Sequence, residues 1–461
     1  MRVAIRTLAL AALFTAGLLQ AEEVERSYYG SVPRGTPTAE ELPLSLGQAV
    51  DRGVKANLSL LLSDQRIRSA RGSQDIARSE LLPDIGVRVS EASQQINLAA
   101  FGFSSFPGIA PIVGPFGLFD IRGQVSQTIF NLRSLDNARA SSRTTKAAEL
   151  QARDTREVVV LVVTGLYLQT LTAASRIEAA KAQVASAEGL YNQAVNFKKA
   201  GTVPAIDVLR AQVELQSQRQ KLITFQNDHE KQKLRLARAI GLPDGQPIRL
   251  TDEIVYIPRQ AVALDQALQQ AYQARMDYKS LEARVESAEL SVKGAAAGHL
   301  PTLEFRGDYG AIGQHPLSSH GTYTAAVSLN VPIFQGGKVR GEITEAEAVA
   351  RQLQAQLADL RGQIAYEIRS AMLDSKAAAD RVEVTQSAVG LARQQEAQAR
   401  DRFAAGVTNN LEVVQAQSAL AAANEDYISS LYSFYVARAQ LARATGGFEK
   451  SLATFLSGVK P

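Results

Sequence analysis

No set of residues in this sequence has the types and spacing of a catalytic or metal-binding motif. The chain has no cysteine and four histidines: His229, His299, His315 and His320. Without cysteine there is no disulfide framework, thiolate metal site or cysteine nucleophile. The histidines do not show the HExxH spacing of a zinc site, and no glycine-rich phosphate loop is present. The sequence therefore predicts a protein that is not an enzyme and that uses no cofactor or metal.

The most distinctive charged residues lie in segments where polar and apolar residues alternate. Alternation with a period of two predicts strands with one apolar and one polar face. The four segments are Ile85–Ser90, Ile121–Ile129, Leu303–Tyr309 and Thr322–Phe334. Five charged residues on the polar faces are candidates for lining an aqueous lumen: Arg88, Arg122, Glu304, Arg306 and Asp308.

Two kinds of sheet fit this alternation. A soluble sheet packs its apolar face on a core, whereas a membrane barrel turns that face to lipid and its polar face to a wet lumen. The segments that flank the strands are expected to be long helices. They offer no obvious core against which the apolar face of the sheet could pack, and this favours the barrel. Four strands cannot close alone, because small membrane barrels have about eight. A barrel would have to be shared among chains related by cyclic symmetry.

The sequence also contains an internal duplication. Leu46-Gly-Gln48-Ala49 matches Leu264-Asp-Gln266-Ala267, and Leu236-Ala-Arg-Ala-Ile-Gly241 matches Leu441-Ala-Arg-Ala-Thr-Gly446. The period is too long for a solenoid repeat and indicates two similar halves. The predicted division is a signal peptide at 1–21, an N-terminal extension at 22–43, a first repeat at 44–242, a connector at 243–263, a second repeat at 264–447 and a tail at 448–461.

Each half is predicted to contain a helix, a strand pair and a long helical hairpin. The first helices, Ser45–Leu82 and Leu264–Gly298, end at or near a Leu-Pro pair, because proline disfavours helical geometry in the preceding residue. The long helices, Asn131–Ala200 and Gln335–Ala405, would each reach roughly 100 Å. They break at Gly201 and Gly406 and resume to Ile240 and Thr445, as helical hairpins do. Helices of this length need partner helices along their whole length.

The joins between the strands differ in length. Ala99–Phe119 is rich in glycine, proline and phenylalanine, whereas Gly313–Gly321 is shorter. In a membrane barrel both would be external loops. The longer one could cover the mouth, contact lipid or be a disordered insertion.

The N-terminus and the overall charge indicate export. Arg2 and Arg6 precede the apolar run Leu8–Leu19, and Ala21 offers a small residue for cleavage, as in a secretory signal. No later segment has 18 uninterrupted apolar residues, so no transmembrane helix is expected. The formal charge is +4, from 50 basic and 46 acidic residues without clusters. This balance argues against a nucleic-acid partner.

Two acidic residues occupy equivalent positions after the hairpin glycines. Asp207 lies six residues after Gly201, and Glu412 lies six residues after Gly406. An acid near a helix N-terminus is favourable by itself, so both could simply stabilise the second helix of each hairpin. In an assembly of three chains the same carboxylates could form a ring that attracts cations.

Taken together, the chain resembles the TolC-like outer-membrane efflux family from about Leu44 to Gly447. The strongest marks are the two turn motifs at Lys199–Gln212 and Phe403–Gln417, which occur in the same order in both halves. The segment Val331-Pro-Ile-Phe334-Gln-Gly-Gly337, which leaves a strand and enters a long helix, is another.

This resemblance implies a mainly α fold with a β-barrel part. Three chains would form a twelve-stranded barrel in outer-membrane lipid and a twelve-helix α-barrel in the periplasm. The homotrimer would be a passive exit duct of a tripartite efflux or type I secretion system. It would dock to a periplasmic adaptor, also called a membrane fusion protein, and through it to an inner-membrane pump of the RND, ABC or MFS type.

The resemblance also implies a periplasmic gate at the hairpin tips. In the family an Asp, an Arg and a Tyr hold the closed tip; Asp207 matches the Asp, but Thr408 and Phe403 stand at the other two positions. Of two acids in the family's pore ring, Glu412 matches one and Gln415 replaces the other. The implied turn and adaptor-docking residues are Gly201, Gly406, Val208, Leu209 and Val413.

One alternative from another class remains. Long alanine-rich helices also suit a trimeric periplasmic coiled coil, structural or adhesive, that has no pore. The charged residues on one face of the predicted strands argue against it.

Overall fold

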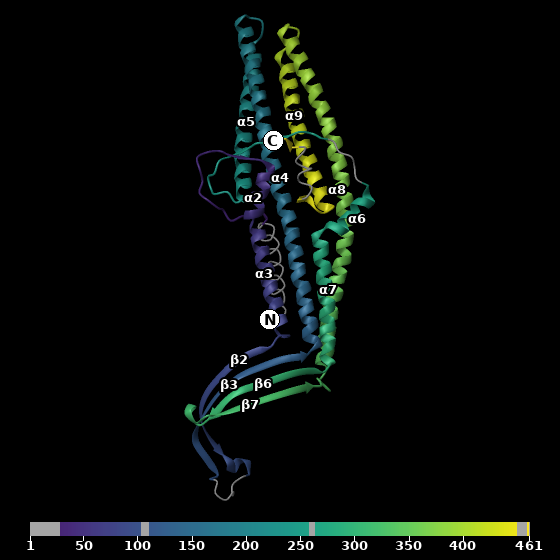
Figure 1. The fold of residues 1–461 in the computed structure, drawn as a ribbon. Helices are drawn as coiled ribbons and strands as arrows, with labels where there is room; N and C mark the ends of the chain where they lie inside the picture. Colours follow the sequence, from purple (N-terminus) through teal and green to yellow (C-terminus); the bar gives the residue numbers. More distant parts are fainter. Residues whose placement is uncertain (1–27, 103–109, 258–262, 450–458, 461) are drawn as a thin grey trace, which may run out of the picture. The chain divides into compact units, whose positions relative to one another are not determined.

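The computed structural model describes residues 28–102, 110–257, 263–449 and 459–460 (Figure 1). The predicted signal peptide lies outside the described residues. The chain divides into two compact units. A helical unit comprises Met1–Gln65, Leu150–Tyr278 and Asp359–Pro461, and a sheet unit comprises Arg66–Glu149 and Lys279–Ala358.

The sheet unit contains one four-stranded antiparallel sheet in the order β2-β3-β6-β7. Its strands are β2 (Asp84–Asn97), β3 (Ile112–Phe130), β6 (Thr302–Gly313) and β7 (His320–Asn330). Short 3₁₀ turns lie beside them: η1 (Leu98–Phe101), η2 (Ala297–His299) and η3 (Pro316–Ser318). All four predicted strands are present, and together with the helices they confirm the mainly α fold class with strands too few to close in one chain.

Two strand boundaries were predicted wrongly. The segment Ala99–Phe119 was expected to be a loop, but β3 already begins at Ile112 and pairs with the end of β2. The cross-strand hydrogen bonds there outweigh the glycines and prolines, which by themselves suggest a loop. At the other end, Thr322–Phe334 was predicted as a strand, but β7 stops at Asn330. Pro332 lacks the N–H needed to continue the ladder.

The first helix of each predicted repeat is two helices. They are α2 (Leu46–Ala56) and α3 (Leu58–Ser79), then α6 (Leu264–Ala274) and α7 (Met276–Ala296). The breaks fall at Asn57 and Arg275, both of which have extended backbone and are buried. Asn57 accepts from the Ser59 N–H at 2.9 Å and donates to the Tyr28 carbonyl at 2.7 Å. At both helix breaks the buried side chain makes polar contacts, and neither break residue is a proline or a glycine.

The long hairpins agree closely with expectation. The helices are α4 (Leu132–Lys199) with α5 (Ala205–Ala239), and α8 (Lys338–Ala404) with α9 (Asn410–Ala444). The first helices have 68 and 67 residues, and both second helices have 35. Equal lengths in both halves place the two turns at equivalent ends of the helical unit (Figure 1).

Short strands and a buried cluster tie the helical unit together. β1 (Leu42–Leu44) pairs in parallel with β4 (Ile248–Leu250), and β5 (Glu253–Ile254) pairs with β8 (Val459–Lys460). These four short strands were not predicted. The Tyr167 hydroxyl, in the middle of α4, lies 2.9 Å from both the Leu44 carbonyl and the Asp252 carboxylate. It thereby joins α4 to β1 and to the segment after β4.

Among the described helices, α4 is long and apolar enough by length and composition to cross a membrane. Its most apolar window is 61% buried inside the protein. Val159, Val163 and Tyr167 are fully buried in the main hydrophobic cluster of the helical unit. Core packing thus accounts for the apolar character of this helix.

A buried network of charges connects four helices of the helical unit. Arg275 donates to Glu367 of α8 and to Asp277, each at 2.6 Å. Arg443 of α9 donates to Asp154 of α4 and lies 3.8 Å from Glu157. Buried ions are tolerated only when they are paired, so these contacts specify how the helices meet.

Replacing Arg275 with alanine should destabilise the protein by about 3–5 kcal/mol, because Asp277 and Glu367 would lose a buried partner. Thermal unfolding in detergent, followed by circular dichroism, measures the effect. Lys181→Ala is the control, since it breaks an exposed pair with Glu178 and should cost less than about 1 kcal/mol. Equal losses in the two variants would contradict a structural role for the buried network.

The network also predicts a pH dependence. Burial raises the pKa of Asp154 above its ordinary value of 3.8, despite the opposing charge of Arg443. Its stabilising contribution is therefore fully present below that value and is lost as pH rises through the raised pKa. As pH rises above about 4, the wild type should therefore lose stability that Asp154→Asn does not lose, so the difference between their unfolding temperatures should shift in favour of the variant.

The pKa of Asp277 is shifted in the opposite direction to that of Asp154, so its effect on stability should have the opposite pH dependence. Burial acts to raise its pKa, but the hydrogen bonds and charge of Arg275 outweigh it and lower the pKa. Its contribution is present above the ordinary value of 3.8 and is lost as pH falls through the lowered pKa. Asp277→Asn should therefore lose less stability than the wild type below about pH 4. The same pH profile for both variants would contradict these assignments.

Candidate functional site

The strand register places all five predicted lumen residues on one face of the sheet. Arg88 pairs directly with Arg122, and Asp308 pairs with Gln124. Arg306 and Glu304 pair with Ser126 and Thr128, two and four residues further along β3. Side chains two residues apart share a face, so these residues form one continuous polar surface. That this surface lines a lumen stays a prediction.

Five charged residues on this face form ion pairs with one another: Asp120, Arg122, Asp308, Glu304 and Arg306. Arg122 donates to Asp120 at 2.7 Å and to Asp308 at 3.3 Å, which joins β3 to β6. Arg306 donates to Glu304 at 2.8 and 3.0 Å. Mixed charges held in this way keep a surface strongly polar without giving it one sign.

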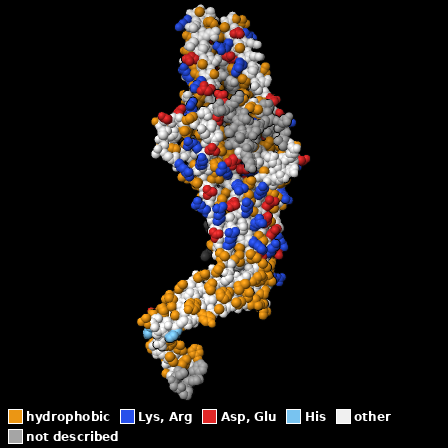
Figure 2. Space-filling view, viewed as in Figure 1, with side chains coloured by type: hydrophobic (Ala, Val, Ile, Leu, Met, Phe, Trp, Pro, Cys, Tyr) orange, Lys and Arg blue, Asp and Glu red, His pale blue; other side chains and the backbone are white. Residues whose placement is uncertain are grey.

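The opposite face of the sheet is apolar and uncovered. Ile85 and Val87 are each 75% exposed, and Tyr323 is 76% exposed. Further exposed apolar residues with the same register are Val89, Ile121, Tyr309, Val327 and Leu329. Figure 2 shows hydrophobic side chains spread almost continuously over the visible strand surface, while the charged side chains gather over the helices. A soluble sheet would bury such a face, whereas lipid would cover it.

At the hairpin tips, the two helix ends have the same backbone geometry. Gly201 and Gly406 have φ of +74° and +73°. Thr202 N–H donates to the Phe197 carbonyl and Gly201 N–H to the Lys198 carbonyl; Val407 and Gly406 repeat this pattern at the other tip. These bonds define a helix end that requires a left-handed residue, a role that glycine fills without strain.

The two tip acids have local partners. Asp207 and Glu412 are each the third residue of their helix, where the helix dipole favours an acid. The Asp207 side chain is nearly buried and lies 3.3 Å from Arg210. Glu412 accepts from Thr408 at 2.7 Å and lies 3.4 Å from Arg402. Their role in a gate stays a prediction, since within one chain both carboxylates are satisfied.

An apolar cluster lies between the tips of the two hairpins. Phe403 is 2% exposed, and its ring lies 5.5 Å from that of Phe197. Val413 belongs to the same cluster, and Val208 packs against it. Leu209 and Gln415 are instead exposed. The predicted tip residues thus divide into a buried set that joins the hairpins and an exposed set that is available to a partner.

Three contributing residues were not predicted from the sequence. Asp120 shares the polar face with Arg122, and strand parity could have identified it. Arg402 supplies the cation beside Glu412, although the family pattern pointed to position 408. Asn410 is fully buried and donates to the Asp207 carbonyl, so it links the two tips. Nothing in the local sequence distinguishes Asn410 from an ordinary helix-start residue.

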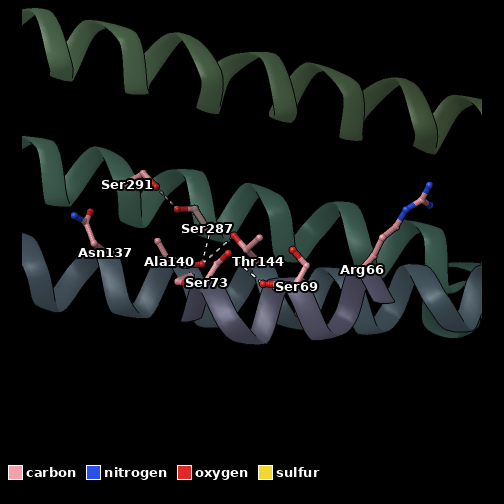
Figure 3. Close-up of a pocket in the computed structure, with 10 residues that line it drawn as sticks. Arg66, Ser69, Ser73, Asn137, Ala140, Thr144, Ser287 and Ser291 are labelled. Atoms are coloured by element: carbon pink, nitrogen blue, oxygen red, sulfur yellow. Dashed lines mark hydrogen bonds between the residues drawn. The ribbon is translucent and has the colours of Figure 1, made fainter. Parts of the chain in front are cut away.

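The helices of the sheet unit enclose a groove of about 490 Å³, lined mainly by small and hydroxyl side chains (Figure 3). Thr144 and Ser287 contact each other at 2.9 Å, and Ser287 donates to the Ala140 carbonyl at 2.8 Å. The hydroxyl groups of Thr144 and Ser287 thus form hydrogen bonds between packed helices. Within the described parts of the chain, no cluster of acidic or histidine side chains could hold a metal ion.

A mainly helical chain whose small sheet is charged on one face and apolar on the other defines a class of protein: a protomer of an outer-membrane channel. The sequence profile of the outer membrane efflux protein family matches residues 51–242 and 267–447. The chain belongs to this family. The predictions of a TolC-like outer-membrane efflux protein and of an outer-membrane location are confirmed.

Individual relatives have low sequence identity to this chain, but the matches cover most of both chains. The toluene efflux pump outer membrane protein TtgF of Pseudomonas putida is 24% identical over 409 residues, 85% of this chain and 81% of that protein. Outer membrane protein TolC of Escherichia coli is 21% identical over 411 residues, 84% and 80% of the two chains. The CmeC outer membrane channel of Campylobacter jejuni has a similar fold, with a TM-score of 0.76 at 17% identity, covering 94% of this chain and 95% of that one.

Asn410→Ala should loosen the contact between the hairpin tips. The Asp207 carbonyl would lose its buried donor, at a cost of about 1–3 kcal/mol. Hydrogen exchange followed by mass spectrometry should show faster exchange at residues 205–211 and 410–417. Gln415→Ala, an exposed position one turn or so along α9, should leave exchange unchanged. Unaltered exchange in Asn410→Ala would mean that the apolar cluster alone holds the tips together.

Proposed function

We propose that this protein is a passive homotrimeric exit duct of a tripartite efflux or type I secretion system. The observation that carries the proposal is the sheet: its apolar face is uncovered, its other face is charged, and it has too few strands to close. A periplasmic adaptor and an inner-membrane pump of the RND, ABC or MFS type would deliver cargo and energy. The duct itself would perform no chemistry.

Barrel closure supports the trimer. β2 and β7 are the outer strands of the sheet, and each has only one partner among the described strands. Pairing β2 of one copy with β7 of the next would satisfy both edges. Three copies of four strands give about twelve strands, which is within the range of membrane barrels. The two hairpins of each copy would then contribute to a helical tunnel on one side of the membrane.

The tips support docking to an adaptor. Apolar side chains remain exposed there on both hairpins: Ile206, Leu209, Val407 and Leu411. Exposed apolar residues beside polar ones suit a protein partner. TtgF is named as part of a toluene efflux pump, and AprF of Pseudomonas aeruginosa, 22% identical, is named as an alkaline protease secretion protein. Both small-molecule efflux and protein secretion are therefore hypotheses to test.

The alternative of a pore-free periplasmic coiled coil is less well supported. Such a protein would leave the apolar face of the sheet in water over most of its length. It would also offer no reason for Arg122, Asp308 and their neighbours to share the other face.

A pair of adjacent substitutions in β7 tests the duct. Val327→Lys places a charge on the apolar face and should lower membrane insertion by about 2–4 kcal/mol. Ala326→Lys, on the polar face of the same strand, should insert normally and shift ion selectivity towards anions. The measurements are the membrane-inserted fraction and conductance in planar bilayers of detergent-purified trimers. Equal insertion of both variants, or wild-type protein that is soluble and forms no channels, would contradict the proposal.

A further inference from the structure

The β2–β3 hairpin is longer than the β6–β7 hairpin beside it. β6 ends at Gly313, which pairs with Phe119, whereas β2 and β3 continue to pair as far as Asn97 and Ile112 (Figure 1). We call residues Glu91–Asn97 and Ile112–Phe119 the outer hairpin. Figure 1 shows this hairpin continuing past the turn that joins β6 and β7.

The register carries the two faces of the sheet into the outer hairpin. Pairing is uninterrupted from Asp84 with Ser126 to Gln94 with Phe116, and the first irregularity comes after Gln94. Phe116 and Leu118 therefore lie on the same face as Arg122. Glu91 and Ser93 lie on the opposite face, which continues the apolar surface of the sheet.

In the outer hairpin the apolar face of the sheet becomes partly polar, since it carries Glu91 and Ser93 beside Phe119. On the sheet proper, the face that carries Val87 and Tyr309 is apolar; in the outer hairpin the same face carries the exposed Glu91 and Ser93. The charged face of the sheet, in turn, continues into Phe116 and Leu118. A carboxylate on the lipid side indicates that the outer hairpin has left the hydrocarbon layer. The side chains on its other face, which include Phe116 and Leu118, then face the axis of the duct.

Gly114 lies close to the ring of Phe116. Gly114 has φ of +110°, and a side chain there would come within 3.2 Å of the Phe116 ring and 2.8 Å of the Gln94 carbonyl. The absence of a side chain leaves room for the aromatic ring on this face. Phe116 and Leu118 are only half-buried within one chain, so part of their apolar surface is free to contact equivalent residues or cargo.

We propose that Phe116 and Leu118, repeated in three copies, form an apolar collar at the outer mouth of the duct. This inference rests on the proposed trimeric channel. An apolar constriction resists filling by water and ions, whereas the desolvation of an apolar solute there is favourable. The paired charges of Asp120, Arg122 and Asp308 lie immediately next to the collar, on the side of the sheet proper. The collar is therefore a specificity-determining element for cargo, separate from the periplasmic tip.

Single-channel conductance of purified trimers in planar bilayers tests the collar. Combining Phe116→Ser with Leu118→Ser should raise conductance by about twofold or more, because the constriction becomes wettable. Phe116→Leu should keep the conductance of the wild type, since it leaves the collar apolar. Phe119→Ser is the matched control, because Phe119 pairs with Glu91 on the opposite face and should not affect conductance.

The outcomes separate the two proposals. Wild-type protein that forms no channels would overturn the exit duct and the collar together. Wild-type channels with the same conductance in the double variant, in trimers shown intact by native mass spectrometry, would overturn the collar alone. An equal rise in conductance in Phe119→Ser would also overturn the collar. The rise would then not depend on the face of the sheet that carries Phe116 and Leu118.

Discussion

The need to pair the backbone of the two edge strands governs the rest of this structure. Among the strands that the structure describes, β2 and β7 each have a neighbour on one side only. In hydrocarbon no water can satisfy the free N–H and C=O groups, and each would cost several kcal/mol. A single copy therefore cannot be stable in the membrane. In the proposed trimer, cyclic pairing of identical copies would remove the edges and at the same time enclose the charged face of the sheet.

The helical unit meets a different requirement, which is to hold long helices in a defined arrangement. α4 and α8 are too long for one compact core, and only part of each is buried in the main cluster. Tyr167, Arg275 and Arg443 supply specific polar contacts between helices where apolar packing is not directional. Asn57 and Arg275 lie at the equivalent breaks of the two halves, so the same bend is held by different chemistry in each.

The tips show how one motif can serve two needs. The left-handed glycines and the acids at the third helical position make each turn stable within a single chain. Asp207 and Glu412 have local partners in Arg210, Thr408 and Arg402. The arginine and tyrosine of the family pattern are replaced by Thr408 and Phe403. The exposed apolar residues next to the two acids remain free for a partner protein.

The sequence by itself determined the four long strands, the two helical hairpins and the faces of the strands. Alternation with a period of two assigned Arg88, Arg122 and Asp308 to one face, and the repeated glycine motifs located both hairpin turns, because these are local properties of the backbone. Only the tertiary structure decided which groups meet. The strand character of Ile112–Phe119, the helix break at Arg275 and the contact of Asn410 with Asp207 all depend on neighbours distant in the chain. Local propensity carries no information about those neighbours, and their hydrogen bonds and burial outweigh it.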